Sequence, residues 1–228
     1  VGHFRRDSTR HTPKALVLTA LSVIPVPLVL SGLGMVLTAG EEPTMPAFGE
    51  AVSQLALAWF MLHLMYRVFD PKGIATQHFQ WNGELVNRLH VLIRRVIWVL
   101  LPLVLVVALG ETRPEQLNDD VIGRLVMLAA LAVLAFMLGR LMYSSEPLYN
   151  SRVVHFSATL ILTVVPLILA GMVFYGYTYT AVKLTDRFIA TLYLIILWML
   201  VEGTILRNLS VVGRRLAYQR AMSRREAE

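Results

Sequence analysis

The sequence predicts an all-α, polytopic membrane bundle of about six transmembrane helices with both termini in the cytoplasm. Three observations carry this prediction. Hydrophobic residues make up 56% of the 228 residues and charged residues only 16%, which is too apolar for an ordinary soluble domain. The apolar residues form runs long enough to cross a hydrocarbon core about 30 Å thick. Basic residues gather beside alternate ends of these runs, as they do in multi-spanning membrane proteins.

The first predicted span covers residues 15–39. Pro25 and Pro27 lie near its middle, and each removes a backbone donor and crowds the preceding turn, so we expect a kink there. Gly32 and Gly34 follow, and their lack of a side chain would let a neighbouring helix approach closely. The span is longer than the apolar region of a usual signal peptide, so we interpret it as a spanning helix.

Four more spans are predicted before the last one. The short second span contains His63, and the third and fifth contain Pro102 and Pro166 as candidate kinks. A polar stretch between the second and third spans contains a turn signal and an aromatic cluster, and we expect part of it to lie along the membrane surface. The four spans are residues 51–66, 91–109, 125–143 and 153–174.

The last predicted span, residues 188–206, leads directly into a basic, amphipathic cytoplasmic tail, residues 207–228. In this tail Leu209, Val212 and Leu216 recur at helical spacing while the arginines fall largely elsewhere, which is typical of a helix lying on an anionic leaflet. Simple anchoring of the last span by positive charge is the alternative explanation. The candidate lipid-headgroup contacts are Arg207, Arg214, Arg215 and Arg220.

Lys and Arg residues gather on one side of the predicted bundle. Of the 21 in the chain, 17 lie on one side, either before the first span, between the second and third, between the fourth and fifth and after the sixth, or, for Arg94, Arg95 and Arg140, just inside the adjoining span ends; four lie on the opposite side. Cytoplasmic loops carry such an excess, so both termini are predicted to be cytoplasmic. The net charge of +6 therefore indicates membrane lipids, and not nucleic acid, as the partner.

Among the ionisable residues inside predicted spans, His63 and Glu202 are the candidates for intramembrane polar contacts. Ionisable residues within a span are candidates for function, but a proton path requires a chain of them across the bilayer. A packing role for His63 and pairing with a nearby cation for Glu202 are therefore the better explanations. The chain has no cysteine and no nucleophile, phosphate-loop or zinc-protease motif. The sequence therefore predicts no enzyme activity, no catalytic residue, no cofactor and no metal site.

Several stretches carry a resemblance to a known family. The run YGYTYTAVKLTDR at 175–187, the leucine-rich span after it and LSVVGRRLAYQR at 209–220 resemble the first inner-membrane domain of large bacterial mechanosensitive channels. These channels are the MscK/MscM type of the MscS superfamily. The basic FRRD at 4–7, the proline-rich first span and GIATQHFQW at 73–81 agree with the resemblance.

The resemblance implies a multi-pass piece of a longer subunit in the bacterial inner membrane, assembled as a heptamer and active in hypo-osmotic shock protection. The 228 residues contain neither a Gly/Ala-rich pore helix nor a β-rich vestibule sequence. We therefore expect the peripheral, tension-sensing and lipid-interacting region of an ion channel. The alternative is a six-helix secondary transporter or transporter half, with His63 and Glu202 in a substrate or proton path. A purely structural scaffold is a third interpretation.

Overall fold

The computed structural model describes residues 11–42, 44–77, 79, 81–112, 121–144 and 152–227, the last of them partly as backbone only. Every long element in these ranges is a helix, and no strand occurs in them. The helices are α1 (His11–Val23), α2 (Pro25–Thr38), α3 (Met45–Val68), α4 (Ile74–Gln77), α5 (Gly83–Thr112), α7 (Val121–Ser144), α8 (Arg152–Phe174) and α9 (Thr178–Ala227).

The prediction of an all-α, multi-spanning bundle is confirmed. Five helices within the described ranges are long and apolar enough to cross a membrane, and α1 with α2 forms a sixth span if the bent pair is counted as one. The bend between α1 and α2 is 49°. It falls at Ile24 and Pro25, where the prolines of the first span predicted a kink.

The other two predicted proline kinks lie inside continuous helices. Pro102 belongs to α5 and Pro166 to α8, and both helices continue through the proline. Membrane helices tolerate proline because neighbouring helices and local adjustment satisfy the freed backbone groups.

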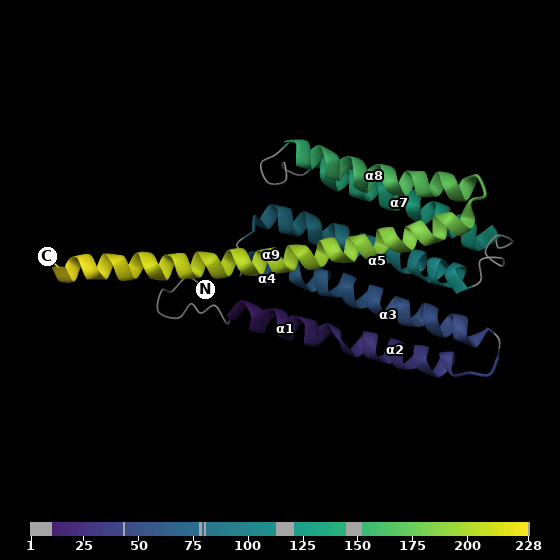
Figure 1. Ribbon diagram of the computed structural model, residues 1–228, viewed down its shortest axis with the longest axis horizontal. Coiled ribbons are helices and arrows are strands. Elements are labelled where there is room, and N and C mark those ends of the chain that lie inside the picture. The colour runs from purple at the N-terminus through teal and green to yellow at the C-terminus, as the bar shows by residue number, and fades with distance from the viewer. Residues whose placement is uncertain are drawn as a thin grey trace.

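The long helices stand side by side in a row (Figure 1). α2 packs on α3, α3 on α5, α5 on α7 and α7 on α8, so α1 and α2 lie at one edge of the row and α8 at the other. α9 crosses this row and packs mainly on α5 and α8. The row therefore has a peripheral hairpin, α2–α3, whose outer helix contacts little besides α3.

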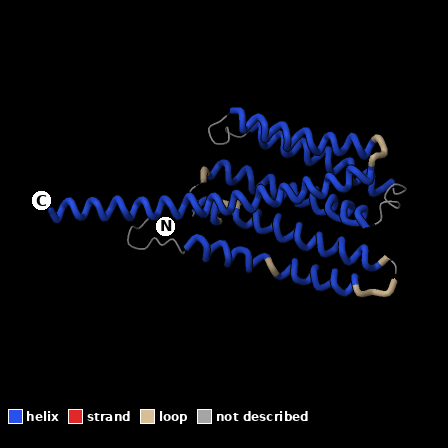
Figure 2. The backbone as a smooth tube through the Cα atoms, viewed as in Figure 1, coloured by secondary structure: helices blue, strands red, loops and turns tan. Residues whose placement is uncertain are grey.

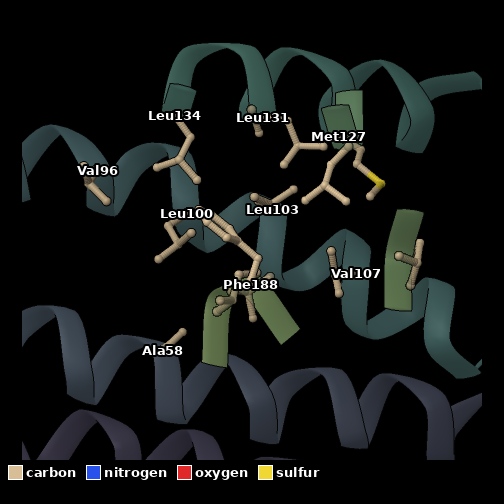
Figure 3. Close-up of a cluster of buried hydrophobic side chains, with 14 of the residues drawn as sticks. Ala58, Val96, Leu100, Leu103, Val107, Met127, Leu131, Leu134 and Phe188 are labelled. Carbon is tan, nitrogen blue, oxygen red and sulfur yellow. The ribbon is translucent and has the colours of Figure 1, made fainter. Parts of the chain in front are cut away.

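The main core lies where α5, α7 and α9 meet (Figure 3). Leu100 and Leu103 of α5 and Leu131 and Leu134 of α7 are buried, and Phe188 of α9 reaches in between them. A second buried cluster joins the C-terminal end of α3 to the N-terminal end of α5. Because lipid is as apolar as these side chains, close packing and not hydrophobicity alone holds such helices together.

α9 is a single helix of 50 residues, and it projects far beyond the other helices (Figure 2). The predicted last span and the basic tail are thus one element. The structure has no break at which the tail turns to lie flat on a membrane surface, so the tail continues the direction of the span.

The connection from α8 to α9 is fixed by local hydrogen bonds. The backbone N–H of Tyr177 donates to Met172 O at 2.9 Å and that of Gly176 to Val173 O at 3.2 Å, the pattern of a Schellman motif. Gly176 has a φ of 89°, which a residue with a Cβ rarely adopts. Arg124 of α7 also donates to Val173 O, at 3.3 Å. The end of α8 is therefore tied to α7.

Candidate functional site

The outer surface of the bundle is apolar over large areas. On α2, Val29, Met35 and Val36 are each more than 70% exposed, at 72%, 74% and 71%. In α9 only 11% of the most apolar stretch is buried, and in α8 only 17%. A soluble monomer rarely exposes such continuous apolar surface, so these faces indicate contact with lipid. The chain is a multi-pass membrane protein.

α2 and α3 touch at their backbones through small residues. A Cβ built on Gly34 would overlap Ser53 and lie 2.8 Å from Gly49 O, and one built on Gly49 would lie 2.5 Å from Thr38 N. Thr38 and Ser53 donate to the carbonyls of Gly34 and Gly49 at 2.8 and 3.0 Å. Each helix thus offers two small residues four positions apart, the pattern of close membrane packing. The prediction for Gly34 is confirmed, whereas Gly32 has no neighbour within 4 Å.

The C-terminal end of α5 and the N-terminal part of α9 are joined by an ion pair. Lys183 Nζ donates to Glu111 Oε1 at 2.8 Å, with side chains 46% and 18% exposed. The two residues are 72 positions apart in the sequence, and no local pattern connects them. Sequence reasoning therefore missed this contact.

The C-terminal end of α3, the N-terminal end of α5 and the middle of α9 meet at residues 69–77, 79, 81 and 82, which we call the inner elbow because this side of the bundle is the one predicted to be cytoplasmic. Ile74 and Ala75 of α4 are 6% and 0% exposed, so the elbow packs into the protein. The predicted aromatic cluster forms here, because Trp81 lies 5.6 Å from both Phe69 and Phe79, measured between ring centroids. The apolar side chains of Ile74 and Ala75 thus pack between helices, and the expectation that part of this stretch lies along the membrane surface stays a prediction.

His63 lies in α3 in a packing position. Its Nδ1 is 3.2 Å from the carbonyl oxygen of Trp59, and its ring stacks on the Trp59 indole at a centroid distance of 4.0 Å. Tyr66, one turn further on, stacks on His90 of α5 at 4.3 Å. Among the described residues no group of three or more His, Asp or Glu residues is placed to hold a metal ion. The geometry favours an aromatic contact between α3 and α5 over a proton path.

The remaining candidate residues lie on α9. Glu202 is partly buried, and Arg207 is buried, with 6% of its surface exposed, so little of Arg207 is open to a headgroup. Arg214, Arg215 and Arg220 belong to the projecting part of α9, but their side chains lie outside the described residues. Headgroup contact by these arginines and the role of Glu202 therefore stay predictions.

The chain is similar to several large channel proteins. It is 30% identical to the mechanosensitive channel MscK of Escherichia coli over 226 residues, which cover 99% of this chain and 20% of MscK. It is 26% identical to the miniconductance mechanosensitive channel MscM of the same organism and 30% identical to an uncharacterized MscS family protein of Haemophilus influenzae. These two matches cover 99% and 96% of this chain and 21% and 20% of the relatives.

The chain thus spans about a fifth of the length of the curated relatives it matches. No solved structure gives a significant match. The family model described as mechanosensitive ion channel inner membrane domain 1 matches residues 1–228. Together with the helical, lipid-facing architecture, this match shows that the chain belongs to the family of mechanosensitive ion channel inner membrane domain 1.

Proposed function

We propose that the chain is the peripheral, tension-sensing and lipid-contacting part of a bacterial mechanosensitive channel in the inner membrane. The observation that carries the proposal is the edge position of α1 and α2, which pack mainly on α3 and expose most of their apolar side chains. Such an element has more contact with lipid than with protein. The channel would protect the cell against hypo-osmotic shock, with both termini of this chain in the cytoplasm.

Tension acts on this edge through its shape. A bilayer under tension thins, and a helix can respond to thinning by changing its tilt or its bend. α1 and α2 already meet at 49°, so opening or closing this angle changes the membrane thickness that the pair fits. Tension changes the populations of a more bent and a less bent α1–α2 pair only if the thinned bilayer changes their relative free energy.

The α2–α3 hairpin would transmit this movement toward the core of the bundle. Because its two backbones touch at Gly34 and Gly49, α3 moves together with α2 and not independently of it. α3 in turn packs on α5, the central helix of the row. Displacement at the edge can therefore reach the core, and the pore would be built by other parts of the subunit, which assembles as a homo-oligomer, a heptamer by family resemblance.

The basic tail adds a second contact with lipid in this proposal. In this proposal Arg214 and Arg215, the first arginines of the projecting part of α9, contact anionic headgroups. If Arg214→Gln and Arg215→Gln together leave both the gating threshold and the binding of anionic vesicles by the full-length protein unchanged, the tail is not a lipid anchor.

The transporter interpretation is not favoured, because the relatives are channels by name and His63 packs between aromatic rings. A pressure ramp on spheroplast patches that lack other tension-gated channels tests the proposal. The full-length protein is expected to conduct under suction, and residues 1–228 alone are expected to stay silent. Current from residues 1–228 alone would place the pore inside this chain and refute the peripheral role.

A further inference from the structure

The inner elbow touches α9 at one glycine. A Cβ built on Gly203 would lie 3.0 Å from both Cδ2 and Cε2 of Phe79 and 3.2 Å from its Cγ. These separations are shorter than ordinary van der Waals contact, so the Phe79 ring rests directly on the backbone of α9. Any side chain at position 203 would require the ring to move away by at least a few tenths of an ångström.

The Phe79 ring is itself held by a chain of aromatic contacts. It lies against Trp81, whose ring lies against Phe69 at the end of α3, with Phe69 only 2% exposed. The backbone N–H groups of Phe79 and Trp81 donate to carbonyls of α4, both at 3.1 Å. These contacts therefore fix the position of Phe79 where it packs against α9.

The same elbow also contacts the edge of the bundle. The buried cluster around Phe69 is covered on one side by residues of α1 and on another by residues of α9. α9 has only a small contact with α3 itself. The elbow is thus a common neighbour of the outermost and the last helix. The covering residues are Leu16 and Ala20 of α1 and Ile196, Met199 and Leu200 of α9.

We propose that Phe79 seated on Gly203 is the inner pivot of α9, a positioning contact through which movement of α1–α3 reaches the helix that leaves the domain. This inference rests on the proposed tension-sensing function. The outer end of α9 is tied separately by Lys183 to Glu111 of α5. The two ties lie 20 residues apart, about 30 Å along a helix, which is the thickness of the hydrocarbon core. Past Gly203, α9 exposes Ile205, Leu206 and Leu209 on one face at 51%, 57% and 63%, while Arg207 and Val211 on the other stay buried at 6% and 3%.

The contact can be removed without changing the rest of α9. Gly203→Val places a branched side chain where the Phe79 ring stands and forces the ring out. Gly213→Val is the matched control, because Gly213 lies on the same helix, carries the same cost in helix propensity and has no atom within 4 Å of its Cβ position. Phe79→Ala removes the ring from the other side and leaves α9 unchanged.

Midpoint tension of the full-length protein is measured in spheroplast patches, with membrane expression checked for each variant. Gly203→Val and Phe79→Ala are both expected to shift the midpoint to higher tension, because edge movement then reaches α9 less completely. Gly213→Val is expected to keep the wild-type midpoint. Equal midpoints for the two elbow variants and for Gly213→Val would overturn the pivot.

A cross-link tests the same contact without depending on a destabilised variant. The 228 residues contain no cysteine, and a sulfur at position 79 would stand close to the present Cγ, 3.2 Å from a Cβ at position 203. Phe79→Cys with Gly203→Cys is therefore expected to form a disulfide on oxidation. A pivot stays in contact during gating, so the oxidised protein is expected to gate at the same tension as the wild type. Loss of gating on oxidation, reversed by reductant, would show that the contact must open and would refute the pivot.

The two levels of inference fail differently. If the wild-type full-length protein shows no pressure-dependent current, the proposed function itself fails. If the wild type gates and the two elbow variants have the same midpoint tension as Gly213→Val, the proposed function stands and only the pivot fails.

Discussion

The contact between α2 and α3 gives the sharpest prediction about stability. Gly49→Ala adds one Cβ that would lie 2.5 Å from Thr38 N and 2.6 Å from Gly34 O, both backbone atoms. Backbone atoms cannot rotate away, so the two helices must separate by about 1 Å to reach ordinary contact distances. We expect Gly49→Ala to destabilise the domain by ~1–3 kcal/mol, the usual range for an overpacked site.

Gly32→Ala is the matched control on the same pair of helices. Its Cβ would meet nothing within 4 Å, so the substitution only removes a glycine from a helix interior. Alanine is favoured there by up to about 1 kcal/mol, although tertiary context changes this value. Gly32→Ala is therefore expected to be neutral or stabilising.

Unfolding of the purified full-length protein in detergent, followed by circular dichroism during heating, compares the two variants. The midpoint temperature is expected to fall for Gly49→Ala and to stay or rise for Gly32→Ala. If both alanine variants unfold at the same temperature, α2 and α3 do not touch at Gly49. The hairpin could then not move as one body, and the mechanical part of the proposed function would lose its basis.

Three further predictions concern single contacts. Glu111→Gln is expected to lower the unfolding temperature slightly at low salt and to have no effect near 1 M salt, where charges are screened within about 3 Å. Because Glu111 and Lys183 form one ion pair, the double variant with Lys183→Gln is expected to lose less stability than the sum of the two single variants, as thermal unfolding would show. Gly176→Ala is expected to cost about 1–2 kcal/mol because of the positive φ, whereas Gly171→Ala within α8 should be neutral; equal unfolding temperatures would contradict this. His63→Phe, which keeps a ring against the neighbouring indole, is expected to leave pressure-gated current unchanged, and loss of current would point to a chemical role for the imidazole.

The spans could be predicted from the sequence because each is a local property. A run of apolar residues of sufficient length has to be a helix in lipid, since its backbone groups find no other partner there. The bend at Pro25 is equally local, because proline removes a donor within its own turn. Even the close approach at Gly34 was predicted, since a glycine in a span marks a place where another helix fits.

The faces of the helices could not be predicted in the same way. Gly32 and Gly34 are two residues apart, which is about 200° around a helix, and only one of them touches α3. In water the apolar face of a helix would be the buried one, but in lipid both faces are apolar. The sequence pattern therefore does not tell which glycine faces protein.

The two ties of α9 were missed for a related reason. Phe79 with Gly203 and Glu111 with Lys183 each join residues from distant parts of the chain. The aromatic cluster in the elbow was visible in the sequence, but nothing local shows which helix receives it. Pairs of this kind follow from the order of the helices in the row, and that order is set by packing.

The length of α9 gives the pivot a consequence beyond this domain. From Gly203 to the last helical residue, Ala227, the helix runs about 36 Å at ~1.5 Å per residue. A change of ~10° in the tilt of α9, well within the range of tilts that membrane helices adopt, would move this end by about 6 Å. The arm on the other side of Gly203 is nearly as long, about 37 Å back to Thr178, so a tilt of α9 about this point would move its two ends by similar distances in opposite directions. Because the pivot divides α9 almost in half, the contact of Phe79 with Gly203 would let the projecting end follow the movement of the membrane-spanning part without loss of amplitude.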